Sequence, residues 1–140
     1  MRYLCLYKPG KPEGDMPNQE EMAKMGAFIE ETVKAGVLLS TEGCQPSANG
    51  FRVRLEDGDY TVTDGPFTET KELIAGMALM QFDSKDEAVY WTKKFLEVAG
   101  GGESEVRAIY EAADFGEEFT PELREQEERW RAQMESNSSR

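Results

Sequence analysis

The sequence predicts an α+β fold of the ferredoxin-like type, an antiparallel sheet with two helices on one face. Apolar residues at helical spacing mark one helix over residues 17–35 and another over residues 85–99. Short apolar or alternating runs before and after each helix mark strands, so the elements form two βαβ-type halves. A length of 140 residues is enough for one such domain.

The first half begins with a predicted strand at Tyr3–Tyr7, which is aromatic and apolar on both alternating faces. The segment Lys8–Asp15 contains two prolines and two glycines and is predicted to be a loop. Pro17 is expected in the first turn of the helix, and Gly36 is expected to cap its end. The core stripe of this helix is predicted to be Met22, Met25, Ile29 and Val33.

A hairpin is predicted in the middle of the chain. Val37–Leu39 indicates a short strand, and Ser40–Gly50 has the glycine, proline and serine content of a loop. Phe51–Leu55 alternates strictly between apolar and polar residues, which is typical of a half-exposed strand. Asp57-Gly58 is a strong turn signal, because glycine accepts the positive φ of a tight turn, and Tyr60–Thr63 is the returning strand.

The second half repeats the pattern of strand, helix and strand. Leu73–Phe82 is predicted to be a strand because Gly76 interrupts it and a serine–glutamate capping box follows at residues 84–87. The glycines at 100–102 end the helix, and Val106–Tyr110 forms the last strand. The core stripe of the second helix is predicted to be Ala88, Trp91, Phe95 and Ala99.

The sheet face without helices needs a cover, because the strand Tyr3–Tyr7 is apolar on both faces. A chain of this length has no third layer to supply it. A second copy of the chain, packed sheet against sheet, would cover this apolar face, and we therefore predict a homodimer.

The C-terminal segment is predicted to be an acidic helical extension, residues 113–140, after a domain over residues 1–112. Thr120 caps a third helix and Pro121 opens it. Its thin apolar stripe allows two interpretations, a solvated terminal helix or an arm that contacts a partner subunit. We expect residues 135–140 to be disordered. The stripe consists of Leu123, Trp130 and Met134.

The composition excludes several function classes. A net charge of −12 disfavours nucleic acids and anionic membrane surfaces as partners. The chain has no histidine, so imidazole bases and histidine-bound metals are excluded. Its cysteines, Cys5 and Cys44, form no disulfide framework and no metal-binding spacing. No signal peptide or membrane span is apparent, so a cytoplasmic protein without metal or cofactor is expected.

The segment Asp64–Glu72, DGPFTETKE, concentrates a turn signal, carboxylates and a lysine immediately before the most apolar run. We take Asp64, Glu69 and Lys71 as candidate catalytic residues. The alternative is structural, with an Asx-type turn at Asp64 and a solvated charge cluster after it. In either case we expect Asp64 to accept backbone N–H bonds from Gly65–Thr68, because its side chain is short.

DGPFTETKE resembles the signature of the DGPF proteins of the YCII-related family, usually written with alanine in place of Thr68. The resemblance extends to residues 35–39 and 42–46 and covers residues 1–112. It implies the dimeric α/β barrel fold, whose ferredoxin-like subunits pair through their sheets. The YCII proposal of a catalytic His and Asp facing a cleft does not carry over, because this chain has no histidine.

Two function hypotheses follow. The first is an enzyme or binding protein for a small anionic or carbonyl ligand, with a pocket between the sheet and the helices near the DGPFTETKE segment. Its ligand-binding residues would be Tyr7, Glu42, Asp64 and Lys71. The second is a non-catalytic regulatory or stress protein that binds a basic partner through its acidic surface. For the second, the resemblance adds that DGPF genes often neighbour those of extracytoplasmic-function sigma factors.

Overall fold

A computed structural model describes residues 1–69 and 72–139, and the chain forms two compact units, Met1–Ala108 and Ile109–Arg140. The first unit contains a four-stranded sheet in the order β2-β5-β1-β6. Each neighbouring pair of strands is antiparallel. The strands are β1 (Arg2–Lys8), β2 (Leu38–Gly43), β5 (Gly76–Gln81) and β6 (Glu103–Ala108).

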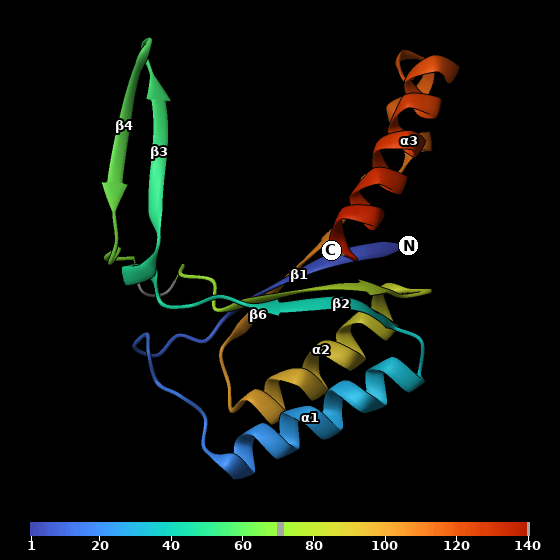
Figure 1. The fold of residues 1–140 in the computed structure, drawn as a ribbon. Coiled ribbons are helices and arrows are strands. Elements are labelled where there is room, and N and C mark those ends of the chain that lie inside the picture. The colour runs from blue at the N-terminus through green and yellow to red at the C-terminus, as the bar shows by residue number, and fades with distance from the viewer. Residues whose placement is uncertain (70–71, 140) are drawn as a thin grey trace. The chain divides into compact units, whose positions relative to one another are not determined.

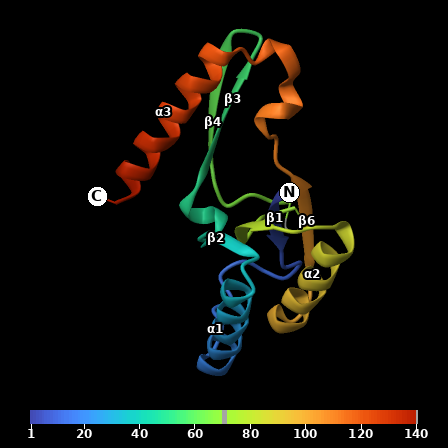
Figure 2. The ribbon, with the colours of Figure 1, turned by 90° about the vertical axis from the view of Figure 1, so that its right-hand side faces the viewer.

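Helices α1 (Gln19–Lys34) and α2 (Lys85–Ala99) lie on the same face of this sheet (Figures 1 and 2). The central strands are β1 and β5, and the edge strands are β2 and β6. The predicted ferredoxin-like α+β fold is therefore confirmed.

The helix ends differ slightly from the prediction for α1 and agree with it for α2. Pro17 lies before α1 rather than in its first turn, because Asn18 caps the helix: its Oδ1 accepts the Glu21 N–H at 2.8 Å. At α2, Ser84 Oγ accepts the Glu87 N–H at 3.1 Å. Gly100 ends α2 with a φ of +87°, a value that glycine accommodates.

Three strands have bounds that were predicted wrongly, and the strand expected over Leu73–Phe82 spans only Gly76–Gln81. β2 continues to Gly43, through residues with the composition of a loop, because pairing with β5 satisfies its backbone. The last strand spans Glu103–Ala108 rather than Val106–Tyr110, in register with β1. The pairing partner, rather than local composition, decides where these strands begin and end.

β3 (Phe51–Glu56) and β4 (Asp59–Asp64) form a separate two-stranded hairpin, as predicted (Figure 1). Asp57 and Gly58 make its turn with φ values of +51° and +83°. Cross-strand pairing places its large apolar residues on one face, where they are all exposed: Phe51, Val53, Leu55, Tyr60 and Val62.

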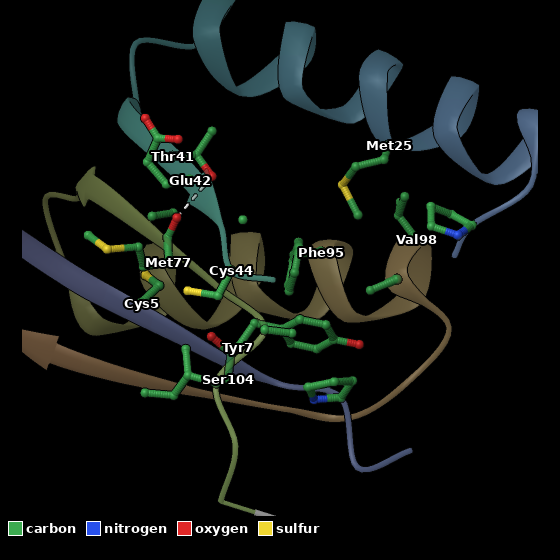
Figure 3. A pocket seen from close by; sticks show the side chains of 18 of the residues that line it. Cys5, Tyr7, Met25, Thr41, Glu42, Cys44, Met77, Phe95, Val98 and Ser104 are labelled. Carbon is green, nitrogen blue, oxygen red and sulfur yellow. Dashed lines mark hydrogen bonds between the residues drawn. The ribbon is translucent and has the colours of Figure 1, made fainter. Parts of the chain in front are cut away.

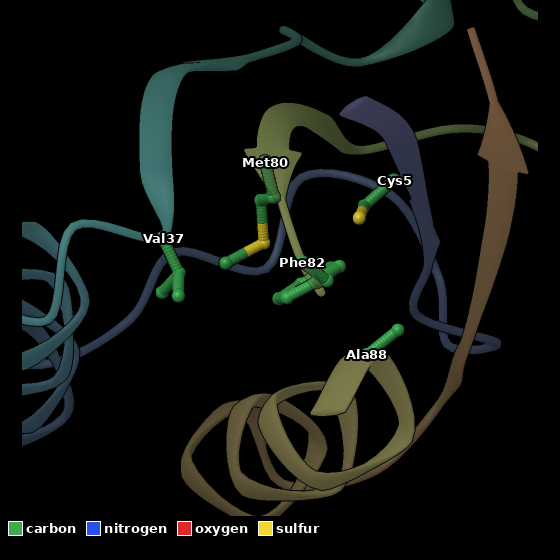
Figure 4. Packing of buried hydrophobic residues seen from close by; sticks show 5 residues of the cluster. All are labelled: Cys5, Val37, Met80, Phe82 and Ala88. Atoms are coloured by element: carbon green, nitrogen blue, oxygen red, sulfur yellow. The ribbon is translucent and has the colours of Figure 1, made fainter. Parts of the chain in front are cut away.

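The core of the first unit lies between the sheet and α2 (Figure 4). Phe82 is only 3% exposed, and Tyr3 packs against it with the ring centroids 5.7 Å apart. The other buried members of the cluster are Cys5, Val37, Met80 and Ala88.

The second unit contains a short 3₁₀ segment (Ala112–Glu118) and α3 (Pro121–Ser138). Thr120 caps α3 as predicted, since its Oγ1 accepts the Leu123 N–H at 3.3 Å. The expectation of disorder from residue 135 is wrong for the described residues, because α3 continues to Ser138. Within the described part of the chain, no helix has both the length and the apolar character of a membrane span.

Candidate functional site

The sheet face under the helices changes from large to small side chains along β5. Met80 and Phe82 belong to the buried core, whereas Ala78 and Gly76 follow toward the other end of the strand. Because small residues cannot fill the space below the helices, the core is incomplete at this end. The strand register places four residues side by side in the last row of this face, and only Tyr7 among them has a large side chain. The row consists of Gly43, Gly76, Tyr7 and Ser104.

A cavity of about 670 Å³ occupies this end of the unit, bounded by the sheet, both helices, residues 9–17 and residues 43–46 (Figure 3). Its volume is within the range of about 300–1,000 Å³ that is usual for small-molecule sites. Most of its wall is apolar, and the larger side chains include Met22, Met25, Phe28, Ile29, Phe95 and Val98.

Most hydroxyl groups of the cavity wall already donate their proton in a hydrogen bond within the protein. Four of them donate to backbone carbonyl oxygens at 2.7–3.0 Å: Tyr7 to Gly101, Thr32 to Ile29, Thr41 to Met77 and Thr92 to Ala88. A hydroxyl oxygen that has donated its proton still has lone pairs to accept with. At these positions the cavity therefore offers hydrogen-bond acceptors.

Charged side chains are few in the wall, and most are acidic. Lys11 is outnumbered by the carboxylates of Glu13, Asp15 and Glu21, and Glu42 lies at the rim. Glu13 is already engaged, because its Oε1 accepts the Ser47 N–H at 2.7 Å. The electrostatic environment of the cavity thus disfavours an anion.

Of the predicted ligand-binding residues, Tyr7 and Glu42 line the cavity. The Tyr7 ring meets Phe95 edge-on with centroids 4.9 Å apart, and partial burial raises the pKa of its hydroxyl. Glu42 follows Thr41 on β2, so strand alternation turns its side chain toward the opposite sheet face. Glu42 therefore borders the cavity at its rim.

Asp64 ends β4, is exposed, and lies outside the cavity wall. The expectation that it accepts the following backbone N–H groups is wrong at two positions. The Gly65 N–H donates to the Gly50 carbonyl at 2.9 Å, and the Phe67 N–H donates to Ser47 Oγ at 3.0 Å. The segment after β2 thus supplies better-placed acceptors than the Asp64 carboxylate.

Glu69 also lies outside the cavity wall and pairs with Arg52, its Oε2 being 3.4 Å from Nη1. Arg52 in turn lies over the Phe67 ring, 3.9 Å from its centroid. Lys71 lies outside the described residues, so its predicted role stays a prediction.

A family model for the YCII-related domain matches residues 1–113. The chain belongs to the YCII-related family. An uncharacterized protein of Rhizobium meliloti (strain 1021) is 30% identical over 93 residues, which cover 66% of this chain and 75% of that protein.

Among solved structures, the chain is similar to 5-chloro-2-hydroxyhydroquinone dehydrochlorinase (TftG) from Burkholderia phenoliruptrix AC1100, in complex with 2,5-dihydroxybenzoquinone. The TM-score is 0.42 and the identity 15%, over 79% of this chain and 94% of that one.

The two cysteines of this YCII-related chain differ in environment. Cys5 is buried in the core, and burial raises the pKa of its thiol from 9.0 to about 11. Cys44 is an exposed free thiol at the cavity wall. Among the described residues, no three acidic or thiol side chains converge as a metal site would require.

Lys8 connects the end of the DGPFTETKE segment to the sheet. Its side chain is 11% exposed, and its Nζ lies 3.1 Å from both Glu72 Oε2 and Glu105 Oε1. The hydrogen bond to Glu105, followed by the one to Glu72, raises the pKa of Lys8. The charged ammonium group therefore pairs this exposed end of the motif with the sheet.

Sequence reasoning placed a pocket between sheet and helices near the DGPFTETKE segment, but it missed the row of small residues beside the cavity and the role of Ser47. The decrease in side-chain size from Phe82 to Gly76 was a usable signal, because alternate residues of a strand face the same layer. The partners of Ser47 gave no comparable signal, since Glu13 and Phe67 are 34 and 20 positions away.

Proposed function

We propose that this YCII-related protein binds a small, neutral and largely apolar molecule in the cavity between its sheet and helices. The observation that supports this most strongly is the incomplete core: an apolar cavity of about 670 Å³ where the row Gly43, Gly76, Tyr7 and Ser104 leaves space. An apolar ligand would replace the missing packing and displace water from apolar walls.

The ligand's polar group is expected to be a hydrogen-bond donor. Tyr7 and Thr41 present oxygens whose protons are already donated to backbone carbonyls. An anionic group would face more carboxylates than amines in the wall. The sequence-based prediction of an anionic or carbonyl ligand depended on Lys71. It stays a prediction, for a ligand bound beside the DGPFTETKE segment.

Two fluorescent dyes with the same aromatic body test this function. N-phenyl-1-naphthylamine is neutral and has an N–H donor, whereas 8-anilinonaphthalene-1-sulfonate adds a sulfonate group. We expect the neutral dye to bind with a stoichiometry of one per chain and at least about tenfold more tightly, a difference of ~1.4 kcal/mol. Fluorescence titrations at fixed ionic strength measure both affinities. Equal affinities, or no saturable binding of the neutral dye, would contradict the proposal.

The predicted acid-base roles of Asp64 and Glu69 remain a proposal that is separate from ligand binding in the cavity. Both carboxylates lie outside the cavity wall, so a reaction at them would use a ligand bound on the motif side. Binding in the cavity requires neither residue.

We further propose that the protein is a homodimer. Strand alternation places Leu4, Leu6 and Leu79 on the sheet face opposite the core residues Cys5 and Met80, and each is only partly buried. Burying such a side chain contributes ~1.5–3 kcal/mol, so a second sheet packed on this face would stabilise both copies. Light scattering at micromolar concentration should give twice the mass of 15.8 kDa. If the wild-type protein is a stable monomer and the Leu6→Glu variant has the same mass in solution, this arrangement is wrong.

The alternative of a regulatory protein has a specific observation of its own. On α3, Leu123, Trp130 and Met134 fall on one helical face by their spacing. We propose residues 113–140 as an extension of the family domain whose apolar stripe contacts another protein. Deleting this extension should then leave dye binding in the cavity unchanged.

A further inference from the structure

The loop that forms one wall of the cavity is attached through Glu13. Residues 9 and 11–17 all line the cavity. The Glu13 carboxylate accepts the Ser47 N–H at 2.7 Å and the Ser47 O–H at 2.6 Å, using both oxygens. A carboxylate that accepts two such bonds is held in one orientation, so this contact fixes the loop at its middle.

The other side of Ser47 is held by the DGPFTETKE segment. Ser47 Oγ accepts the Phe67 N–H at 3.0 Å while donating to Glu13. Gly65 packs directly on the Ser47 carbonyl, since a Cβ built at Gly65 would lie 1.7 Å from that oxygen. The Gly65 N–H also donates to the Gly50 carbonyl at 2.9 Å. Ser47 is therefore held between the motif and the wall of the cavity.

We propose that Ser47 is a positioning residue through which the DGPFTETKE segment holds residues 9–17 against the cavity. The motif then acts in ligand binding by supporting the wall, without contacting the ligand. Its effect on ligand affinity rests on the proposed function, whereas its effect on the order of the loop does not.

The contacts make the proposal specific to the Ser47 hydroxyl. With alanine at position 47, the Glu13 carboxylate keeps the backbone N–H but loses the O–H, and Phe67 loses its acceptor. Threonine at the same position retains a hydroxyl and should restore both bonds. Asn49→Ala is a matched control, because within the described part of the chain the Asn49 Nδ2 donates only to Gln45 Oε1, in the same short turn, at 2.8 Å.

Backbone ¹⁵N relaxation of the full-length protein tests the loop directly. We expect order parameters at residues 10–16 to fall in Ser47→Ala from values near 0.85 toward about 0.6, the range of flexible backbone. Ser47→Thr and Asn49→Ala should remain near wild type. Glu13→Ala should loosen the loop but leave the Phe67 amide protected from hydrogen exchange, because its bond to Ser47 persists.

Titration with N-phenyl-1-naphthylamine then tests the consequence for binding. Ser47→Ala should bind the dye about tenfold more weakly, since part of the binding energy must now order the loop. Unchanged order parameters in Ser47→Ala, or an equal loss in Asn49→Ala, would overturn the positioning role. If the dye does not bind the wild-type protein, the proposed function fails while the relaxation data still decide the role of Ser47.

Discussion

Replacing Ala78 with phenylalanine is expected to weaken binding of N-phenyl-1-naphthylamine by at least about 100-fold, ~2.7 kcal/mol. Ala78 lies on the sheet face below the helices and lines the cavity, so a ring at this position occupies the space that the dye needs. The free energy of unfolding should change little, because the new ring enters an existing void rather than a filled core. Fluorescence titration and thermal melts measure the two quantities.

Ala78→Ser is the matched control for this variant. Serine is similar in size to alanine and leaves the cavity open, so dye affinity should stay within about threefold of wild type, ~0.6 kcal/mol. If Ala78→Phe binds the dye as wild type does, the dye binds elsewhere and the cavity is not the site.

Gly65→Ala is expected to destabilise the first unit by about 3 kcal/mol, at the upper end of the usual cost of overpacking. A Cβ at residue 65 would lie 1.7 Å from the Ser47 carbonyl oxygen and 2.6 Å from its carbon. Backbone atoms of a hydrogen-bonded turn cannot move away as a flexible side chain can. The contacts from Gly65 and Phe67 to residues 47–50 should therefore break, and the melting temperature should fall by roughly 10 °C.

Gly50→Ala is the matched control, because Gly50 also lies next to the Ser47 carbonyl oxygen. A Cβ at Gly50 would lie 3.6 Å from the Ser47 carbonyl oxygen, an ordinary van der Waals distance, and the Gly50 backbone is extended. We expect this variant to melt within about 2 °C of wild type. Similar melting temperatures for the Gly65 and Gly50 variants would show that the packing of Gly65 on Ser47 is unimportant.

The fold could be predicted because its signals are local and periodic. The capping box at Ser84 and the turn at Asp57-Gly58 each depend on residues within a few positions of one another. The predicted core stripe of α1 was wrong in its residues, because the buried positions are Phe28 and Thr32. The predicted members Met22, Ile29 and Val33 are exposed. The errors in strand bounds fell where a distant strand decides the outcome, as in the extension of β2 to Gly43 by pairing with β5.

The site was harder to predict for a related reason. The segment Asp64–Glu72 drew attention because it concentrates charge and turn residues, yet its described contacts are structural: Gly65 on Ser47, Glu69 on Arg52 and Glu72 on Lys8. The cavity exists instead because one row of the sheet carries small residues, which leave space unfilled. Their alignment across four strands depends on the register, which a single sequence does not supply.

The most direct measurement is a crystal structure of the protein with N-phenyl-1-naphthylamine bound. We expect electron density for the dye in the cavity, with its rings against Met25 and Phe95 and its N–H directed toward the oxygens of Tyr7 or Thr41. Density on the open sheet face at Leu6 and Leu79, or beside Asp64 and Glu69, with an empty cavity would contradict this expectation.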